Sequence, residues 1–131
     1  MLAEDNKALS GLRMEHSEEC IKAAKNLLLS ENYKSAVNRA YYAVFHAMRA
    51  VLALDGFDSK RHSGIIAEFR RRYIKAGIFD SSLSKTISIL FDLRTDSDYD
   101  DFFIISKSDA ARQTSKAEEF VSAIKEYLDN K

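Results

Sequence analysis

The sequence predicts an all-α protein, and three observations lead to that prediction. There is no proline and there are only four glycines among 131 residues, so few positions interrupt a helix. Alanine, leucine, lysine and glutamate are plentiful, and long periodic segments dominate the chain. A chain of this length can close one hydrophobic core. We therefore expect a single domain over residues 1–131, folded as an up-and-down antiparallel bundle of four main helices plus a shorter one.

The first two predicted helices are long and follow each other closely. The first spans about residues 4–29, and Gly11 is a point at which it could be interrupted. Its expected inward stripe consists of Leu9, Leu12, Cys20, Ala24, Leu27 and Leu28. The second spans about residues 33–54 and is expected to stop at Gly56.

The third predicted helix begins near His62, with Ser59 or Ser63 as its cap, and ends at Gly77. The fourth starts at the segment D-S-S-L and runs to about residue 95. An acidic loop, D-S-D-Y-D-D-F-F, follows it.

The last predicted helix opens at Ser106 or Ser108. Its expected inward residues are Ala111, Ala117, Phe120, Ile124, Tyr127 and Leu128. Because the connections between these helices are short, neighbouring helices are expected to run antiparallel.

Composition excludes several classes of function. Twenty basic and twenty acidic residues cancel, so bulk charge does not predict nucleic-acid binding, although a local basic site stays possible. The start of the chain does not resemble a signal peptide, and no apolar run approaches the roughly 20 residues that cross a bilayer. The single cysteine, Cys20, cannot form an internal disulfide and is expected to be a buried structural thiol. We expect a cytoplasmic protein without a membrane segment.

The second helix has one apolar side at about 100° per residue. That side carries Val37, Tyr41, Val44, Phe45, Met48, Val51 and Leu52, and it is expected to form the core against the first, fourth and fifth helices.

The opposite side of the second helix is polar. Arg39 and His46 are seven residues apart, so they stand two turns from each other on nearly the same line, with Tyr42 between them. Ala43 and Ala50 flank this stripe and would let another helix approach closely. Geometry alone fits a solvated helix face at least as well as a binding site.

Several blocks of the chain resemble the small prokaryotic HEPN-domain proteins. The blocks are S-A-V-N-R-A-Y-Y-A-V-F-H-A, K-R-H-S-G-I-I, F-R-R-R-Y-I-K-A-G, L-R-T-D-S-D-Y-D and A-E-E-F-V-S-A-I-K-E-Y-L, in this order. The resemblance implies an all-α bundle that is commonly a homodimer. Its characteristic element is an arginine followed by four to six residues and a histidine, which Arg39 and His46 match at the long end. Many members are metal-independent RNA-cleaving toxins paired with a nucleotidyltransferase partner, while others bind nucleotides or proteins without known catalysis.

The chemistry implied suits these residue types. Cleaving RNA without metal needs a base for the 2′-hydroxyl proton and an acid for the leaving 5′-oxygen, and histidine can serve as either. A guanidinium such as that of Arg39 can meet two phosphoryl oxygens at once. We predict Arg39 and His46 as catalytic residues and RNA or a nucleotide as the ligand. A two-fold homodimer would bring two such pairs into one cleft.

The predicted substrate-binding residues are Asn38, Tyr42, Arg49 and His62. Clear nuclease members usually carry a polar residue directly after the arginine and a tyrosine two residues after the histidine. Ala40 and Met48 occupy those places here. Tyr42 could substitute as a hydrogen-bond donor to phosphate, or the site could bind without cleaving. Two hypotheses therefore stand, a dimeric ribonuclease and a nucleotide- or RNA-binding module that pairs with a nucleotidyltransferase protein.

The remaining histidines are weaker candidates. His62 could line the same site, but local packing at a helix start is the more common role of such a residue. His16 is expected to be only a surface residue of the first helix. No metal site or cofactor is predicted, because the acidic loop lacks the glycine and the closing glutamate of a calcium-binding EF-hand.

Two further polar groups are assigned to structure. The three arginines at positions 70–72 point in several directions around a helix, so salt bridging at the surface is their expected role. Arg94 and Asp98 have the spacing of an ion pair within one helix, and Tyr99 could anchor the acidic loop to the bundle.

Overall fold

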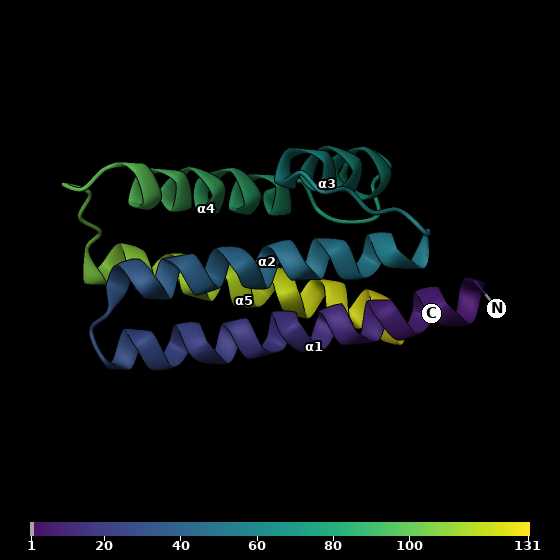
Figure 1. The fold of residues 1–131 in the computed structure, drawn as a ribbon, viewed down its shortest axis with the longest axis horizontal. Coiled ribbons are helices and arrows are strands. Elements are labelled where there is room, and N and C mark those ends of the chain that lie inside the picture. Colours follow the sequence, from purple (N-terminus) through teal and green to yellow (C-terminus); the bar gives the residue numbers. More distant parts are fainter. Residues whose placement is uncertain (1) are drawn as a thin grey trace.

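The computed structural model describes residues 2–131, and within this range the chain is helical with no strand. The elements are α1 (Leu2–Leu29), α2 (Tyr33–Leu54), α3 (His62–Phe69), a π-helical segment η1 (Arg70–Ile74), α4 (Ser82–Tyr99) and α5 (Lys107–Asp129), shown in Figure 1. The predicted all-α bundle is confirmed. None of the helices in residues 2–131 combines the length and apolar character that crossing a membrane requires.

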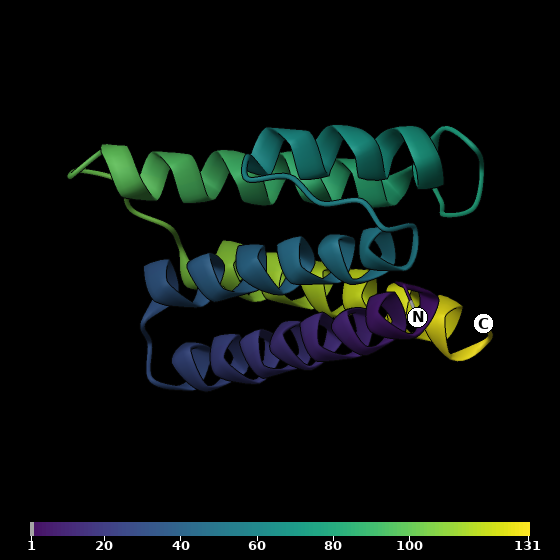
Figure 2. The same cartoon turned by 45° about the vertical axis from the view of Figure 1, so that its right-hand side comes forward.

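Helix α2 is the centre of the bundle. It packs against α1 and α5 on one side and against α3 and α4 on the other, as Figures 1 and 2 show. From Ala36 to Ala53 every residue is buried or half-buried, because neighbours surround the helix on nearly all sides. The predicted core face is confirmed, since each of its residues is at most 5% exposed: Val37, Tyr41, Val44, Phe45, Met48, Val51 and Leu52.

The antiparallel pairing of α1 with α2 is fixed by a tight turn and by side-chain bonds. Glu31 takes the left-handed backbone conformation, with φ of 62°, at the turn between the two helices. The Ser17 hydroxyl donates to the Ala43 carbonyl at 2.6 Å, and the Arg13 guanidinium donates to the Arg49 carbonyl at 3.3 Å. The backbone of α1 is thereby held directly on α2.

This pairing corrects the expected role of the two alanines beside the polar stripe. Ala43 and Ala50 are both fully buried inside the single chain, and the Ala43 carbonyl is bonded to α1. These alanines therefore do not offer a surface on which a second subunit could pack.

The predicted stripe of α1 is partly wrong. Leu9 and Leu12 are 38% and 48% exposed, and α1 continues through Gly11 without interruption. The buried positions of its first half are Ser10, Arg13, Met14 and Ser17. Three of these four are polar, and cross-helix hydrogen bonds satisfy Arg13 and Ser17. Because these buried residues are polar, the apolar periodicity of the sequence does not reveal them.

The ends of α2 and α3 follow the glycines. Gly56 has φ of +74°, and the Phe57 amide donates back to the Leu52 carbonyl at 3.1 Å, which closes α2 as predicted. Gly77 has φ of +81° after the π-helical segment. The cap of α3 is a correction, because Arg61 is the N-cap residue and no side chain bonds to the helix start.

Helices α4 and α5 differ from the prediction at three points. α4 extends to Tyr99, four residues beyond the expected end, and it includes the predicted Arg94–Asp98 pair at 3.0 Å. Tyr99 is 86% exposed and does not anchor the loop.

The start of α5 is confirmed at Ser106, whose hydroxyl accepts a bond from the Asp109 amide at 3.1 Å. Ala111 is exposed, and its neighbour Ala110 is the buried residue, so that inward position was misplaced by one.

Replacing Met48 by alanine should destabilise the fold, because Met48 is fully buried at the centre of α2. We expect the free energy of unfolding to fall by about 2–5 kcal/mol, from lost burial and the cavity left behind. Urea unfolding followed by circular dichroism measures it. Leu29→Ala serves as the control, because Leu29 is 84% exposed and should change stability by less than about 0.5 kcal/mol. Equal losses in the two variants would contradict the assignment of the core.

Candidate functional site

The polar side of α2 faces the space beside α1, and it carries Arg39, Tyr42 and His46 on successive turns. We call these three residues together with His16 of α1 the arginine–histidine patch. The Arg39 guanidinium lies over the Tyr42 ring, 5.1 Å from its centroid, and donates two hydrogen bonds of 3.3 and 2.9 Å to the Asn38 amide oxygen. No carboxylate within residues 2–131 forms an ion pair with Arg39.

His46 lies between two aromatic neighbours. Its ring centroid is 6.1 Å from that of Tyr42 and 5.7 Å from that of His16, and the two histidine rings meet edge to face. Its Nδ1 atom is buried and has no hydrogen-bond partner among the residues described. Burial, followed by the positive potential of His16 and nearby arginines, lowers the pKa of His46 to about 4. The ring is therefore neutral at physiological pH.

His16 is an exposed residue of α1, as expected. The contact of its ring with His46 was not predicted. A signal for this contact exists in the sequence, because His16 and His46 are each fifteen residues from Glu31, the centre of the turn between two antiparallel helices. Arg13 and Arg49 are likewise each eighteen residues from Glu31, and they too are in contact.

Arg49 is not free to bind a ligand. Its guanidinium bonds to both carboxylate oxygens of Asp58 at 3.2 Å, and the buried Arg13 bonds to the same carboxylate at 3.1 Å. Burial opposes ionisation of Asp58, but the Ser59 amide and both guanidinium groups outweigh it and hold the pKa of this carboxyl below its ordinary value. An anionic substrate would have to compete with Asp58 for Arg49.

His62 packs in the way that its helix-start position predicts. Its ring stacks on Phe45 with centroids 4.1 Å apart, and its Nδ1 atom forms a 2.7 Å hydrogen bond with the Tyr41 hydroxyl. Burial, then the charges of Arg94 and Arg49, lowers the pKa of His62. It also lies 5.9 Å from the Tyr42 ring, so it adjoins the arginine–histidine patch while serving the core.

Arg94 connects α4 to the patch, which the sequence analysis did not anticipate. Besides its ion pair with Asp98, its guanidinium donates to the Tyr42 hydroxyl at 3.1 Å and lies over the Tyr41 and Tyr42 rings. Because the Tyr42 hydroxyl accepts this bond, its own hydrogen is left available for a ligand.

The other sequence candidates are structural. Arg71 and Arg72 pair with Glu68 at 2.8 and 2.7 Å, which confirms the expected salt bridges for these two. Arg70 differs, because it donates to the hydroxyls of Ser84 and Ser88 and forms no ion pair with any residue in the described range. The thiol of Cys20 is buried, as predicted, and burial raises its pKa although the nearby Arg39 acts in the opposite direction. Within residues 2–131 no group of three potential ligands is close enough to hold a metal ion.

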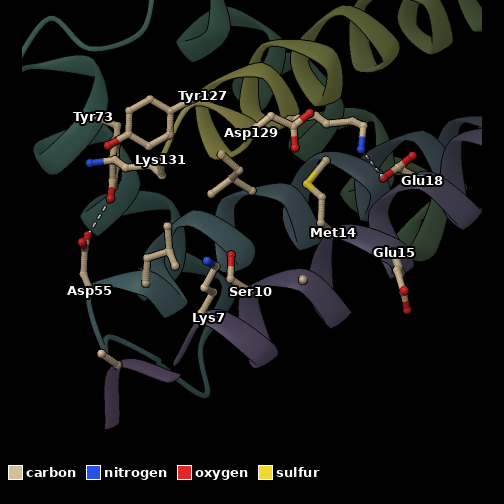
Figure 3. A pocket seen from close by; sticks show the side chains of 15 residues that line it. Lys7, Ser10, Met14, Glu15, Glu18, Asp55, Tyr73, Tyr127, Asp129 and Lys131 are labelled. Atoms are coloured by element: carbon tan, nitrogen blue, oxygen red, sulfur yellow. Dashed lines mark hydrogen bonds and ion pairs between the residues drawn. The ribbon is translucent and has the colours of Figure 1, made fainter. Parts of the chain in front are cut away.

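A groove between α1 and α5 lies away from the patch. It measures about 780 Å³ and runs between the N-terminal half of α1 and the C-terminal end of α5, as Figure 3 shows. Met14 and Ser10 line one side, Tyr127 lines the other, and Tyr73 donates to Asp55 at 2.7 Å at its edge. Arg39, Tyr42, His46 and His16 do not line it. Within the patch, Arg39, Tyr42 and His46 are half-buried and His16 is exposed.

Comparison with known proteins identifies the family. The HEPN domain matches residues 11–127. The chain belongs to the HEPN family. A "UPF0332 protein" of Thermotoga maritima is 34% identical over 114 residues, covering 87% of this chain and 86% of that protein.

Two archaeal relatives are similar over nearly their whole length. A "UPF0332 protein" of Archaeoglobus fulgidus is 37% identical, covering 87% of this chain and 90% of that protein. A protein of Methanocaldococcus jannaschii named "Putative toxin MJ0142" is 33% identical, covering 90% of this chain and 80% of that protein. The predicted family is confirmed.

The two departures from the nuclease pattern lie in the core of this HEPN domain. Ala40 and Met48 are both fully buried, so neither position faces the arginine–histidine patch. Along α2, position 48 is about 180° from position 39 at the usual helical step. A polar residue at either place would enter the core unless α2 rotated.

Stability should depend on pH through His46. Above its ordinary pKa of 6.5 the ring is neutral in both states, whereas between about 6.5 and about 4 only the unfolded chain takes up the proton. The free energy of unfolding therefore falls as the pH is lowered through this window, by about 1–3 kcal/mol. Urea unfolding of wild type and His46→Gln between pH 7.5 and 4.5 isolates this contribution. The other titrating groups are the same in both proteins, so their effects cancel in the difference between the two free energies of unfolding. Parallel curves for the two proteins would disprove the burial effect.

Proposed function

We propose that this HEPN protein is a toxin-like ribonuclease that cleaves RNA without a metal ion, using Arg39 and His46. The observation that carries the proposal is the half-buried Arg39 guanidinium, which lacks a carboxylate partner and lies on the same side of α2 as His46. The buried and half-buried arginines at positions 13, 49, 72 and 94 each have a carboxylate partner. Arg70 instead makes three hydrogen bonds to two serines.

The cleavage step follows from these groups. The 2′-oxygen of one nucleotide forms a bond to the adjacent phosphorus while the bond from phosphorus to the 5′-oxygen breaks. His46, neutral at physiological pH, takes the 2′-hydroxyl proton, and the leaving oxygen gains a proton. Arg39 meets two phosphoryl oxygens as negative charge develops, and the Tyr42 hydroxyl donates to the same group. The products are a 2′,3′-cyclic phosphate and a 5′-hydroxyl.

His46→Ala should abolish cleavage of single-stranded RNA, and Arg39→Lys should lose most of it because an ammonium cannot present a planar fork to two oxygens. We expect losses of about 10²–10⁴-fold. Gel assays with purified protein measure cleavage, chelator should leave it unchanged, and mass spectrometry should find the cyclic phosphate. Arg112→Lys is the matched control, since Arg112 is an exposed arginine paired with Asp109 on α5.

A second candidate function has one observation in its favour. The low pKa of His46 makes it a weak base in the free protein, and Arg49 is already engaged by Asp58. Both features suit a module that binds a nucleotide or RNA without cleaving it. If wild-type protein leaves every RNA intact yet binds a nucleotide in a manner that depends on Arg39, this function replaces the ribonuclease.

The HEPN relatives also motivate a proposal on assembly. We expect a homodimer with Arg39 and His46 near the subunit boundary. Leu9 and Leu12 are exposed on the side of α1 that carries His16, because residues 9, 12 and 16 fall within about 60° of one another at the helical step. Two large apolar side chains exposed beside the patch are suited to burial against a second copy.

A Leu12→Glu substitution should therefore weaken the dimer by about tenfold or more, since it places a charge in an apolar contact. Sedimentation equilibrium over a range of concentrations measures this. Leu29→Glu is the control, because Leu29 is exposed at the other end of α1. A wild-type monomer at high concentration, or equal weakening by both substitutions, would count against the proposed face.

A nucleotidyltransferase-type partner protein belongs to the same proposal. Tyr99 at the end of α4 is 86% exposed, and Phe102 and Ile104 in the loop between α4 and α5 are 91% and 88% exposed, among several aspartates. Large apolar side chains exposed in this way support binding of another protein. This loop projects at the end of α4 in Figure 1, apart from the start of α1.

A further inference from the structure

The cleavage step leaves one role without a residue, because the leaving 5′-oxygen needs a proton and a neutral His46 serves as the base. The chain has three histidines. His62 is held by Phe45 and by its hydrogen bond to Tyr41, so it is committed to the core. His16 is the third, and its ring makes no hydrogen bond with another residue in the range 2–131.

The packing of α1 on α2 determines the position of His16. Ser17, the next residue, is bonded to the Ala43 carbonyl, and Arg13, one turn earlier, is bonded to the Arg49 carbonyl. These two bonds hold α1 on α2 three residues before and three residues after His46. The pairing of α1 with α2 therefore fixes the position of His16 beside His46.

The two rings have complementary surroundings. His46 is half-buried and neutral, whereas the His16 side chain is exposed to solvent. The rings meet edge to face with centroids 5.7 Å apart and share no hydrogen bond, so each keeps a nitrogen available for a substrate. No carboxylate pairs with His16 among the described residues.

We propose that His16 is the general acid of this site, supplied by α1 of the same chain. The proposal rests on the ribonuclease function proposed above. His46 accepts the 2′-hydroxyl proton, and protonated His16 gives its proton to the 5′-oxygen as the bond from that oxygen to phosphorus breaks. The chain then contains a base, an acid and the Arg39 guanidinium, and a second subunit is not needed to provide another histidine.

A pair of substrates that differ in their leaving group tests this role. The first is a short RNA, whose 5′-oxygen needs a proton on leaving. The second is uridine 3′-(4-nitrophenyl phosphate), whose 4-nitrophenolate leaves without one. His16→Gln should slow RNA cleavage by about 10²–10⁴-fold but should stay within about threefold of wild type on the nitrophenyl ester. His46→Ala should lose activity on both, because both need the base.

The control is Lys22→Gln, which removes a charge from an exposed residue of the same helix and should leave both rates unchanged. If His16→Gln slows both substrates equally, His16 has only a structural role and the inference is wrong. If it slows neither while His46→Ala is inactive, the ribonuclease function stands and His16 is not its acid. If wild-type protein cleaves neither substrate, the ribonuclease function and this inference both fail.

Discussion

The pairing of α1 with α2 is the contact on which the rest of the structure depends. A left-handed residue at Glu31 reverses the chain, and the bonds from Ser17 and Arg13 to carbonyl groups of α2 fix how far one helix slides along the other. Buried polar groups of this kind must be satisfied, so these two bonds favour the observed register of α1 on α2. The same register sets His16 beside His46. The register of α1 on α2 therefore contributes to the stability of the fold and also sets the geometry of the patch.

The fold and one side of the site could be predicted from the sequence because each depends on periodicity within a single helix. The core face of α2 and the line from Arg39 to His46 both follow from 3.6 residues per turn. His16 could not be placed in this way, because a helical wheel does not say which turn of a neighbouring helix lies opposite. Counting residues on either side of Glu31 identifies the facing turn only if the connection between the two helices is tight. The tight connection depends on a left-handed backbone conformation at Glu31, which non-glycine residues seldom adopt. The misplaced stripe of α1 has a related cause, since serine and arginine occupy its buried positions.

Local charge balance separates Arg39 from Arg13, Arg49 and Arg94, the other arginines around the patch, in a chain that is neutral as a whole. Asp58 neutralises part of the charge of Arg13 and Arg49, and Asp98 does the same for Arg94. These three arginines and two aspartates together carry one net positive charge, and Arg39 adds a second. Arg39 is the one guanidinium of this group without a carboxylate partner among the described residues. A protein built in this way needs no overall positive charge to hold an anion at a defined place.

The lowered pKa of His46 bears on how the proposed site would work. Burial is the largest cause, and the positive neighbours add to it. A phosphate beside Arg39 would bring negative charge close to the imidazole, which favours the protonated form and raises the pKa of His46 in the complex. The burial effect stays, but the negative charge of the phosphate opposes the effect of the positive neighbours on the pKa. His46 would then be a stronger base with substrate bound than in the free protein, and nearer to the range in which an imidazole transfers protons efficiently. The low pKa of His46 in the free protein is therefore compatible with the proposed catalysis, because the negative charge of a bound substrate would raise that pKa.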